Sequence, residues 1–416
     1  MKIANKLLSN KRVILVIYVA FALVATTQSI LLKPTHYNYE AGKYIDKEDG
    51  QYTATLYNNY IIFKNSFAHL IQSSDLYKFY LNEHWDLYKY SPTFSLFMGL
   101  FYFLPDVIGL FLWNLLNAIV LLVAVYYLPN LSLKNKGLIL ISILVELMTC
   151  MQCEQSNALI CGLIILAFGL LERGNYFVGI FCIIATAYIK LFGIVALALL
   201  IFYPGKWKLA LYTLFWSVFL FALPLVVISV PQLLAQYKSW GQLLSNDHTV
   251  STGLSVAGWL SSWFKLSVNK SIITLGGVIL FCLPFIRYKE YSNYLFRLLA
   301  FSSVLIWVVI FNHRAESPTY IIAMGGVAIW FFSQKFTTEN FILFLLAIVF
   351  TSLSPTDLFP PTLRKGLFQP YVVKAVPCIL IWIKVLYDQL FNRNIQLETD
   401  EQHFEFADNN KTYSRQ

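Results

Sequence analysis

The feature that most constrains this chain is a succession of apolar runs, each close to the length that crosses a lipid bilayer. Val13–Leu32, Val107–Leu128 and Leu295–Phe311 each contain at most one charged residue. A helix needs about 20 residues to cross roughly 30 Å of hydrocarbon, and it satisfies its own backbone polar groups there. The alternating polar positions of a membrane β-barrel are absent. The sequence therefore predicts an all-α, polytopic helical membrane protein.

The composition agrees with this fold class. Hydrophobic residues make up 58% of the 416 positions and charged residues only 13%, which is too little charge to cover the surface of a soluble protein. The net charge of +9 is assigned to cytoplasmic loops that contact anionic lipids. We therefore expect membrane lipids, and no nucleic acid, among the partners.

Basic residues predict how the chain is oriented. Lys2, Lys6, Lys11 and Arg12 precede the first apolar run, and positive loops stay in the cytoplasm. Short basic loops recur later, and we place them inside as well: Lys134/Lys136, Arg173, Lys206/Lys208, Arg287/Lys289 and Lys335. The result is a single membrane domain, residues 1–391, with about twelve crossings. An acid-rich tail, residues 392–416, is expected to be cytoplasmic and disordered.

One stretch bears on the parity of this topology. Two apolar pieces between Ser91 and Leu128 are separated by Pro105–Asp106. We favour one crossing, Val107–Leu128, preceded by a half-helix or re-entrant piece at Pro92–Leu104. If both pieces cross, the number of crossings is odd and every later loop inverts.

With the favoured topology, the polar insertions collect on the outer face. They comprise three long loops and shorter interruptions of the apolar runs, at 33–90, 231–270 and 355–370, and at Glu154–Asn157, Lys190 and Asn312–Glu316. The cytoplasmic loops are short and merely basic. A protein with its elaborate loops on one face is expected to act at that face.

The first outer loop is the richest. Tyr57–Leu70 carries apolar residues at three- and four-residue spacing, which predicts an amphipathic helix lying in the membrane interface. After it come acids and aromatic rings suited to a sugar platform, in which rings stack on pyranose faces and carboxylates bind hydroxyls: Asp75, Glu83, Asp86, Tyr88 and Tyr90. The alternative for Tyr88 and Tyr90 is an interfacial aromatic belt.

Polar residues between apolar runs supply further candidates, because such side chains are expensive at membrane depth unless they line a cavity, pair with one another or act on a substrate. The substrate-binding candidates of this kind are Glu154, Gln155, Asn157, Lys190, His313, Arg314 and Glu316. Lys190 and Arg314 are candidates for contacting a phosphate, with His313 and His248 as secondary partners. Two structural alternatives remain: Glu316 neutralises Arg314, and Lys190 extends its amine to the interface.

Several short motifs, in this order, resemble glycosyltransferase family 87 of the GT-C superfamily. The similarity runs from about residue 55 to about residue 330 and rests on Asn59-Tyr60-x-x-Phe63, Asp75-Leu76-Tyr77, Tyr88-x-Tyr90-Ser91-Pro92, Trp113-Asn114-x-x-Asn117, Glu154-Gln155-Ser156-Asn157 and Gly179 to Lys190. The resemblance implies a GT-C-like bundle in the cell membrane. It also implies transfer of a mannose-like hexose from a polyprenyl-phosphate sugar donor to a lipid-linked or cell-envelope glycan or glycolipid acceptor, outside the cytoplasm.

Two departures from the family pattern bear on the chemistry. The family generally has an aspartate where Asn59 stands, and the resemblance implies that this acid is the general base; an amide cannot take the proton. Three alternatives follow: another first-loop acid serves, with Asp86 first and Asp75, Asp46 or Asp49 behind it; the register differs; or the reaction needs only a weaker base. In addition, Leu191 follows Lys190 where the family has proline.

The expected chemistry needs few parts. A base takes the acceptor proton as C1 of the sugar is attacked, and Lys or Arg stabilises the charge that grows on the leaving phosphate. No metal site is predicted, because Cys150-x-x-Cys153 has no second ligand pair nearby, and no cofactor is certain. The rival functions are a polysaccharide polymerase or ligase acting on lipid-linked glycans, and a lipid-linked-sugar transporter.

Overall fold

The computed structural model describes residues 6–31, 36–38, 43–45, 57–84, 86–246, 252–267 and 269–392. Within these residues the chain is helical, apart from loops and one short antiparallel pair, β1 (His36–Asn38) with β2 (Lys43–Ile45). The prediction of a helical membrane fold is therefore confirmed. The tail 393–416 and the candidates His248, Asp46 and Asp49 lie outside the described residues.

Three helical stretches are long and apolar enough to cross a membrane: Lys11–Leu31, Asp106–Tyr127 and Lys206–Val226. A fourth candidate is a pair, Pro361–Phe368 and Val373–Phe391, that bends by 79°. The remaining apolar helices are shorter, as expected for segments packed inside a bundle. The predicted number of crossings stays a prediction.

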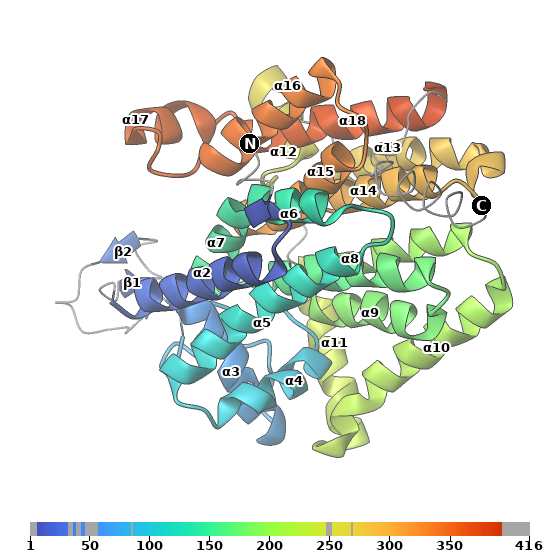
Figure 1. Cartoon of the computed structure of the whole chain (residues 1–416). Helices are drawn as coiled ribbons and strands as arrows, with labels where there is room; N and C mark the ends of the chain where they lie inside the picture. The colour runs from blue at the N-terminus through green and yellow to red at the C-terminus, as the bar shows by residue number, and fades with distance from the viewer. Residues whose placement is uncertain are drawn as a thin grey trace, which may run out of the picture.

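The elements follow one another along the chain, with the longest connections before α3 and before α4. Their bounds are α2 (Lys11–Leu31), α3 (Asn58–Ile71), α4 (Pro92–Tyr102), α5 (Asp106–Tyr127), α6 (Leu133–Ser142), α7 (Leu144–Gln152), α8 (Asn157–Glu172), α9 (Tyr176–Ile189), η2 (Leu191–Phe202), α10 (Lys206–Ala222), η3 (Leu223–Val226), α11 (Val230–Asn246), α12 (Val256–Phe264), α13 (Lys270–Cys282), η5 (Leu283–Ile286), η6 (Tyr288–Glu290), α14 (Tyr294–Ile310), η7 (Ser317–Thr319), α15 (Tyr320–Phe332), α16 (Thr338–Leu346), η8 (Ala347–Leu353), α17 (Pro361–Leu363), η9 (Arg364–Phe368), η10 (Val373–Ala375) and α18 (Val376–Phe391). The centre is formed by α5 on α2 and α8, and by α14 on α15 and α18. Figure 1 shows these helices running roughly side by side, with β1, β2 and α17 at the left.

Contacts between distant segments define two ends of the bundle. At the first, which we call the polar end, the end of α2 meets the α7–α8 turn through Ser29 and Glu154, and the α9–η2 junction lies at Lys190. At the second, the basic end, α8 finishes at Glu172, whose carboxylate accepts a hydrogen bond from Tyr203 just after η2. Two of the polar insertions predicted for one face, the Glu154–Asn157 turn and Lys190, therefore meet at one end.

The α9–η2 junction is a tight reversal. Lys190 is extended between the two helices, and η2 runs back against α9. A Cβ atom at Gly193 would lie 2.2 Å from the Thr186 hydroxyl oxygen, so only glycine lets η2 approach α9 this closely. This close packing fixes Lys190 at the turn.

The Ser91–Leu128 stretch divides as predicted. Helix α4 has 11 residues, or about half the span of a bilayer at 1.5 Å per residue, whereas α5 is long enough to cross. The Ser91 hydroxyl at the start of α4 donates to the carbonyl oxygen of Tyr188, near the polar end. After α4, Lys64 donates to Leu104 O at 2.9 Å and pairs with Asp106 at 2.5 Å. A helix that starts and finishes at one end of the bundle fits a half-helix.

The predicted amphipathic helix is present as α3, within one residue of its expected bounds. Its apolar face does not lie open, because Tyr60, Phe63 and Leu70 are buried and the helix packs on α4. The Phe63 ring meets the rings of Tyr90 and Trp113 with centroids 4.7 and 5.9 Å apart. Protein rather than lipid therefore covers these residues.

The second long loop packs on the first. Gln236 of α11 accepts a hydrogen bond from Leu76 N at 3.1 Å and donates to Ser74 O at 2.6 Å. Trp240 of the same helix donates to Lys89 O at 3.2 Å. Beyond α11, Leu254 N donates to Ala315 O at 2.8 Å. Segments far apart in the sequence thus form one layered cap over the polar end.

Candidate functional site

The α7–α8 turn forms the floor of the site. Glu154 adopts a left-handed backbone conformation, with φ of +48°, and its side chain is buried. The Ser29 hydroxyl donates to Glu154 Oε1 at 3.1 Å, and the Trp113 indole N–H donates to the Glu154 carbonyl at 2.7 Å. A strained backbone and a buried carboxylate at one residue are typical of functional positions.

Lys190 reaches this turn from the α9–η2 junction. Its Nζ donates to Gln155 Oε1 at 2.9 Å and to Asn157 Oδ1 at 3.0 Å. Both acceptors are neutral amides, so the hydrogen bonds hold the ammonium group in place without cancelling its charge. A fixed cation of this kind is suited to bind an anion.

Tyr90 completes the group. Its hydroxyl donates to Gln155 Oε1 at 3.1 Å, its ring lies 5.4 Å from Lys190 Nζ, and it stacks on Phe94 with centroids 4.8 Å apart. We call Tyr90, Gln155, Asn157 and Lys190 the polar centre. The structure brings together four of the residues that the sequence nominated from three separate segments.

The Asn312–Glu316 turn approaches the polar centre. Glu316 is exposed, and its charge acts on Lys190, Tyr90 and Arg314. Arg314 is half-buried, and its backbone N–H donates to Asn312 Oδ1 at 3.0 Å. His313, also half-buried, lies in the same turn. Both cationic candidates, Lys190 and Arg314, thus have Glu316 as a shared electrostatic neighbour.

Asn59 and Asp75 of the first loop have defined structural contacts. Asn59 Nδ2 donates to the carbonyl oxygen of Cys153 at 2.9 Å, which places this residue directly beside the Glu154 turn. Asp75 accepts from Tyr77 N at 3.1 Å and from the Ser239 hydroxyl at 3.3 Å. These bonds tie Asp75 to the join between the two long loops.

Glu83 and Asp86 are more accessible. Glu83 accepts from Asn65 at 2.9 Å and lies 3.2 Å from His69 Nε2. Asp86 Oδ1 accepts from Leu87 N at 2.7 Å and lies 3.6 Å from Lys89. Its side chain remains 38% exposed, so a substrate hydroxyl has room to approach it.

His84 stands between these acids and is buried. Burial lowers the pKa of His84 below its ordinary value, against smaller opposing effects of Asp86 and Glu83. Its Nδ1 lies 2.8 Å from the Asp86 carbonyl oxygen. A neutral ring therefore supports the backbone of the segment that carries Asp86.

The proposed sugar platform does not form an open surface of rings. Tyr88 is 2% exposed, and its hydroxyl donates to Ser91 O at 2.8 Å. Tyr90 is also buried, at 5%, but its hydroxyl belongs to the polar centre. The aromatic pattern fits an interior cluster as well as a platform, because ring spacing along a loop does not reveal which side packs inward.

The sequence reasoning missed the buried charged pairs, among them Lys374 with Glu146. Lys374 Nζ lies 2.6 Å from Glu146 Oε1 and also donates to Thr351 O at 3.0 Å. The ammonium group lies 5.2 Å from the ring centroid of Tyr320. An acid inside the apolar run Gly137–Met151 was the available signal. Its partner was not apparent, because it lies 228 residues away.

The chemistry available at the polar end follows from these groups. The two cations and the neutral amides can bind a phosphate. The carboxylates, which differ in how exposed they are, can accept a proton. Among the described residues, no three His, Cys, Asp or Glu side chains are grouped as metal ligands. The six cysteines are free, and four of them are buried.

Comparison with known families identifies the chain. The sequence model of glycosyltransferase family 87 matches residues 88–355, which is more than half of the chain and includes Tyr90, Gln155, Asn157, Lys190 and Arg314. The match begins after Asn59 and Asp75, so it leaves the register of the earlier first loop untested. Among curated proteins, none matches this chain. The chain belongs to glycosyltransferase family 87 and is a membrane glycosyltransferase.

Proposed function

We propose that this protein transfers a mannose-like hexose from a polyprenyl-phosphate donor to a lipid-linked or cell-envelope glycan at the outer face of the cell membrane. The observation that carries the proposal is the geometry of Lys190. Its ammonium group is fixed at 2.9 Å by Gln155 and 3.0 Å by Asn157, and neither neutral amide neutralises its charge. It is therefore available to a phosphate.

The donor phosphate is proposed to lie between Lys190 and Arg314. As the acceptor hydroxyl oxygen bonds to C1 of the sugar, the bond from C1 to the phosphate oxygen breaks. The electron pair of that bond stays on the lipid phosphate, whose negative charge grows. A cation already held in place stabilises that charge without having to reorganise, and an arginine adds a forked contact.

Asp86 is proposed as the base that takes the acceptor proton. Its side chain is as exposed as that of Glu83, at 38%, and it lies nearer than Glu83 to the start of α4. The geometry raises one rival, Glu316, which is exposed and whose charge acts on Lys190. Asp75 is less suited, because Tyr77 N and Ser239 occupy its two oxygens.

A transfer assay separates these roles. The reconstituted full chain is incubated with radiolabelled polyprenyl-phosphate hexose and membrane acceptors. Asp86→Asn should lower turnover by about a hundredfold or more, while Glu316→Gln should act mainly on donor affinity. Asp357→Asn is a matched control, because Asp357 is almost fully exposed and pairs with Arg364.

The outcomes are distinct. Loss of turnover in Glu316→Gln with normal turnover in Asp86→Asn would make Glu316 the base. Repeated extension of a lipid-linked glycan by preformed units would indicate the polymerase alternative. Movement of intact donor across the membrane, without transfer, would indicate the transporter.

The proposed sidedness has its own test. Lys238 of α11 and Lys208 of α10 are both exposed and belong to the two different ends. Each is replaced by cysteine in a background where Cys153 and Cys282, the two cysteines that are not buried, are serine. An impermeant reagent added outside intact cells should label position 238 and spare position 208. The reverse pattern would place the polar centre in the cytoplasm.

A further inference from the structure

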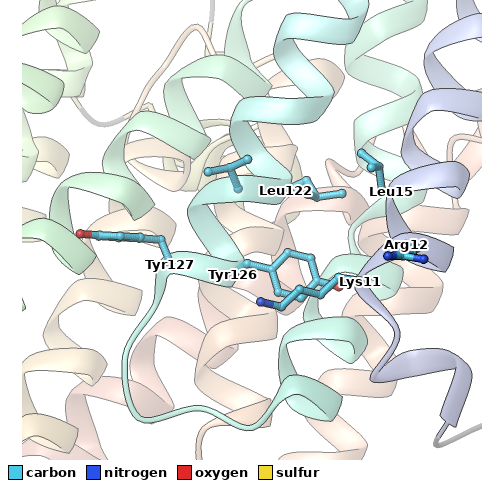
Figure 2. Close-up of a pocket in the computed structure, with 7 residues that line it drawn as sticks. Lys11, Arg12, Leu15, Leu122, Tyr126 and Tyr127 are labelled. Carbon is cyan, nitrogen blue, oxygen red and sulfur yellow. The ribbon is translucent and has the colours of Figure 1, made fainter.

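A second feature lies at the basic end, away from the polar centre. A hollow of about 370 Å³ opens between α2 and α5, lined chiefly by Lys11, Arg12, Leu15, Leu122, Val123 and Tyr126. Figure 2 shows Lys11 lying along the Tyr126 ring near Arg12, with Leu15 and Leu122 to one side. The hollow therefore has a cationic part and an apolar part.

The apolar part faces outward along two of the long helices. Leu15 is 39% exposed and Val123 is 48% exposed, and both belong to helices that are long enough to span a membrane. Exposed aliphatic side chains on such helices are suited to contact lipid hydrocarbon. A ligand of this part is expected to carry an acyl chain.

The positive charge of the cationic part is not balanced by neighbouring carboxylates among the described residues. Lys11 Nζ lies 5.5 Å from the Tyr126 ring centroid. The buried Lys136 donates a hydrogen bond to the backbone carbonyl oxygen of Tyr126 at 3.0 Å. The charged neighbours of Lys136 are Arg173 and Lys11. Among the residues that the structure describes, no carboxylate lies within ion-pair distance of these cations or of Arg12. Like charges held together in this way favour an anion.

Tyr126 borders the hollow with its ring. Its hydroxyl oxygen is buried, so the ring rather than the oxygen faces a ligand in the hollow. The hollow therefore combines cations, an aromatic ring and an apolar wall.

We infer that this hollow is a binding site for an anionic phospholipid, with the lipid phosphate at Lys11 and Arg12 and an acyl chain along Leu15 and Val123. The site is separate from the polar centre, which lies at the opposite end of the bundle. Basic pockets between membrane helices are suited to anionic headgroups. The apolar wall favours a lipid over a free phosphate ion, which would use only the cationic part.

The test measures lipid retention by the purified full chain. Retention of phosphatidylglycerol, of phosphatidylcholine and of inorganic phosphate is followed by native mass spectrometry and by thermal stability. Phosphatidylglycerol should be retained preferentially. Lys11→Gln and Arg12→Gln should each weaken that retention by about fivefold, as expected for one basic side chain at an anionic surface.

Lys208→Gln is the matched control. Lys208 is exposed and also lies over a tyrosine ring, 5.7 Å from the centroid of Tyr212, but it does not line the hollow. The Lys208→Gln variant loses the same charge and the same kind of ring contact as Lys11→Gln, but at a position outside the hollow. Lipid retention should therefore stay at the level of the unmodified chain. A Leu15→Gln variant should weaken lipid retention without altering any response to phosphate.

Three outcomes would overturn the inference. Equal retention of phosphatidylcholine and phosphatidylglycerol would remove the role of charge. Stabilisation by inorganic phosphate equal to that by the lipid would remove the role of the acyl chain. Phosphatidylglycerol retention that rises sharply when the tail acids Glu398, Asp400, Glu401, Glu405 and Asp408 are changed to amides would assign the hollow to that segment.

Discussion

At the polar end, Lys190 is held by the neutral amides of Gln155 and Asn157, whereas at the basic end Glu172 is held by a full opposite charge. Arg297 donates to both oxygens of Glu172 at 2.7 Å, and Tyr203 donates to the same carboxylate at 2.7 Å. Both sites hold a charged side chain by hydrogen bonds from separate helices. Only the second cancels the charge, so it can hold α8, α14 and the end of η2 together without attracting a ligand.

The comparison shows that the same kinds of charged side chain can either hold helices together or bind a ligand. A closed ion pair in a buried place fixes helices to one another, and its loss leaves an uncompensated charge. A cation held by amides keeps its charge for an external anion. Lys374–Glu146 is a second closed pair, between η10 and α7. Charge compensation, rather than burial, distinguishes the candidate site.

The largest expected effect comes from opening the closed pair at the basic end. Arg297→Met leaves Glu172, whose side chain is 5% exposed, without its cation and should destabilise the fold by about 3–5 kcal/mol. Unfolding followed by fluorescence in detergent measures this. Turnover per folded molecule should stay near normal, and adding Glu172→Gln should recover much of the stability. Lost turnover in a fully stable variant would contradict the distinction between the two ends.

A smaller change in stability but a larger change in activity is expected at the polar end. Lys190→Met should lower transfer by about a hundredfold, because the growing phosphate charge loses a fixed cation. Thermal stability should change little, because the hydrogen-bond partners of Lys190 are neutral and its acidic neighbour Glu316 is exposed. Lys208→Met is the control, as a lysine over a tyrosine ring that belongs to the other end. If Lys190→Met unfolds the protein and double replacement with Glu316→Gln restores it, Lys190 is a structural charge.

The smallest effect concerns the strained turn beneath Lys190. Glycine adopts the φ of +48° found at Glu154 without steric cost, whereas alanine does not. Glu154→Gly should therefore be more stable than Glu154→Ala by about 1 kcal/mol. Chemical unfolding of the two variants measures the difference, and transfer assays on both show whether the carboxylate itself is needed. Equal stabilities would mean that the turn stores no backbone strain.

The strained turn at Glu154 lies in one of the motifs that carry the family resemblance. The motif Glu154-Gln155-Ser156-Asn157 carries part of the family resemblance, and its first residue, Glu154, has a left-handed backbone. Asn59, at the position where the family pattern has an acid, donates to the carbonyl oxygen of the preceding residue, Cys153. Two of the motifs that carry the family resemblance, beginning at Asn59 and at Glu154, 95 positions apart in the sequence, are thus neighbours in the structure.

By itself, the sequence determined the membrane class and the helical fold, and it nominated most residues of the candidate site. Apolar runs of bilayer length leave few other folds, and the periodicity of 57–70 predicted α3 within one residue. The cost of polar groups in apolar surroundings singled out Gln155, Asn157, Lys190 and Arg314. These are local properties of a chain in lipid, so a single sequence displays them.

Only the tertiary structure decided which of these residues meet and what each side chain contacts. Lys374 could not be paired with Glu146 from the sequence, because helix packing sets contacts across 228 positions. The Tyr88 side chain is buried, and Asp75 links the two long loops through its hydrogen bond with Ser239. Hydrophobic spacing shows which face of a helix is apolar, but it does not show whether protein or lipid covers that face. Likewise, the sequence shows which residues are cationic, but it does not show whether a neighbouring side chain neutralises them. Both answers depend on packing between segments far apart in the chain, which is why the open charge of Lys190 became visible only in the fold.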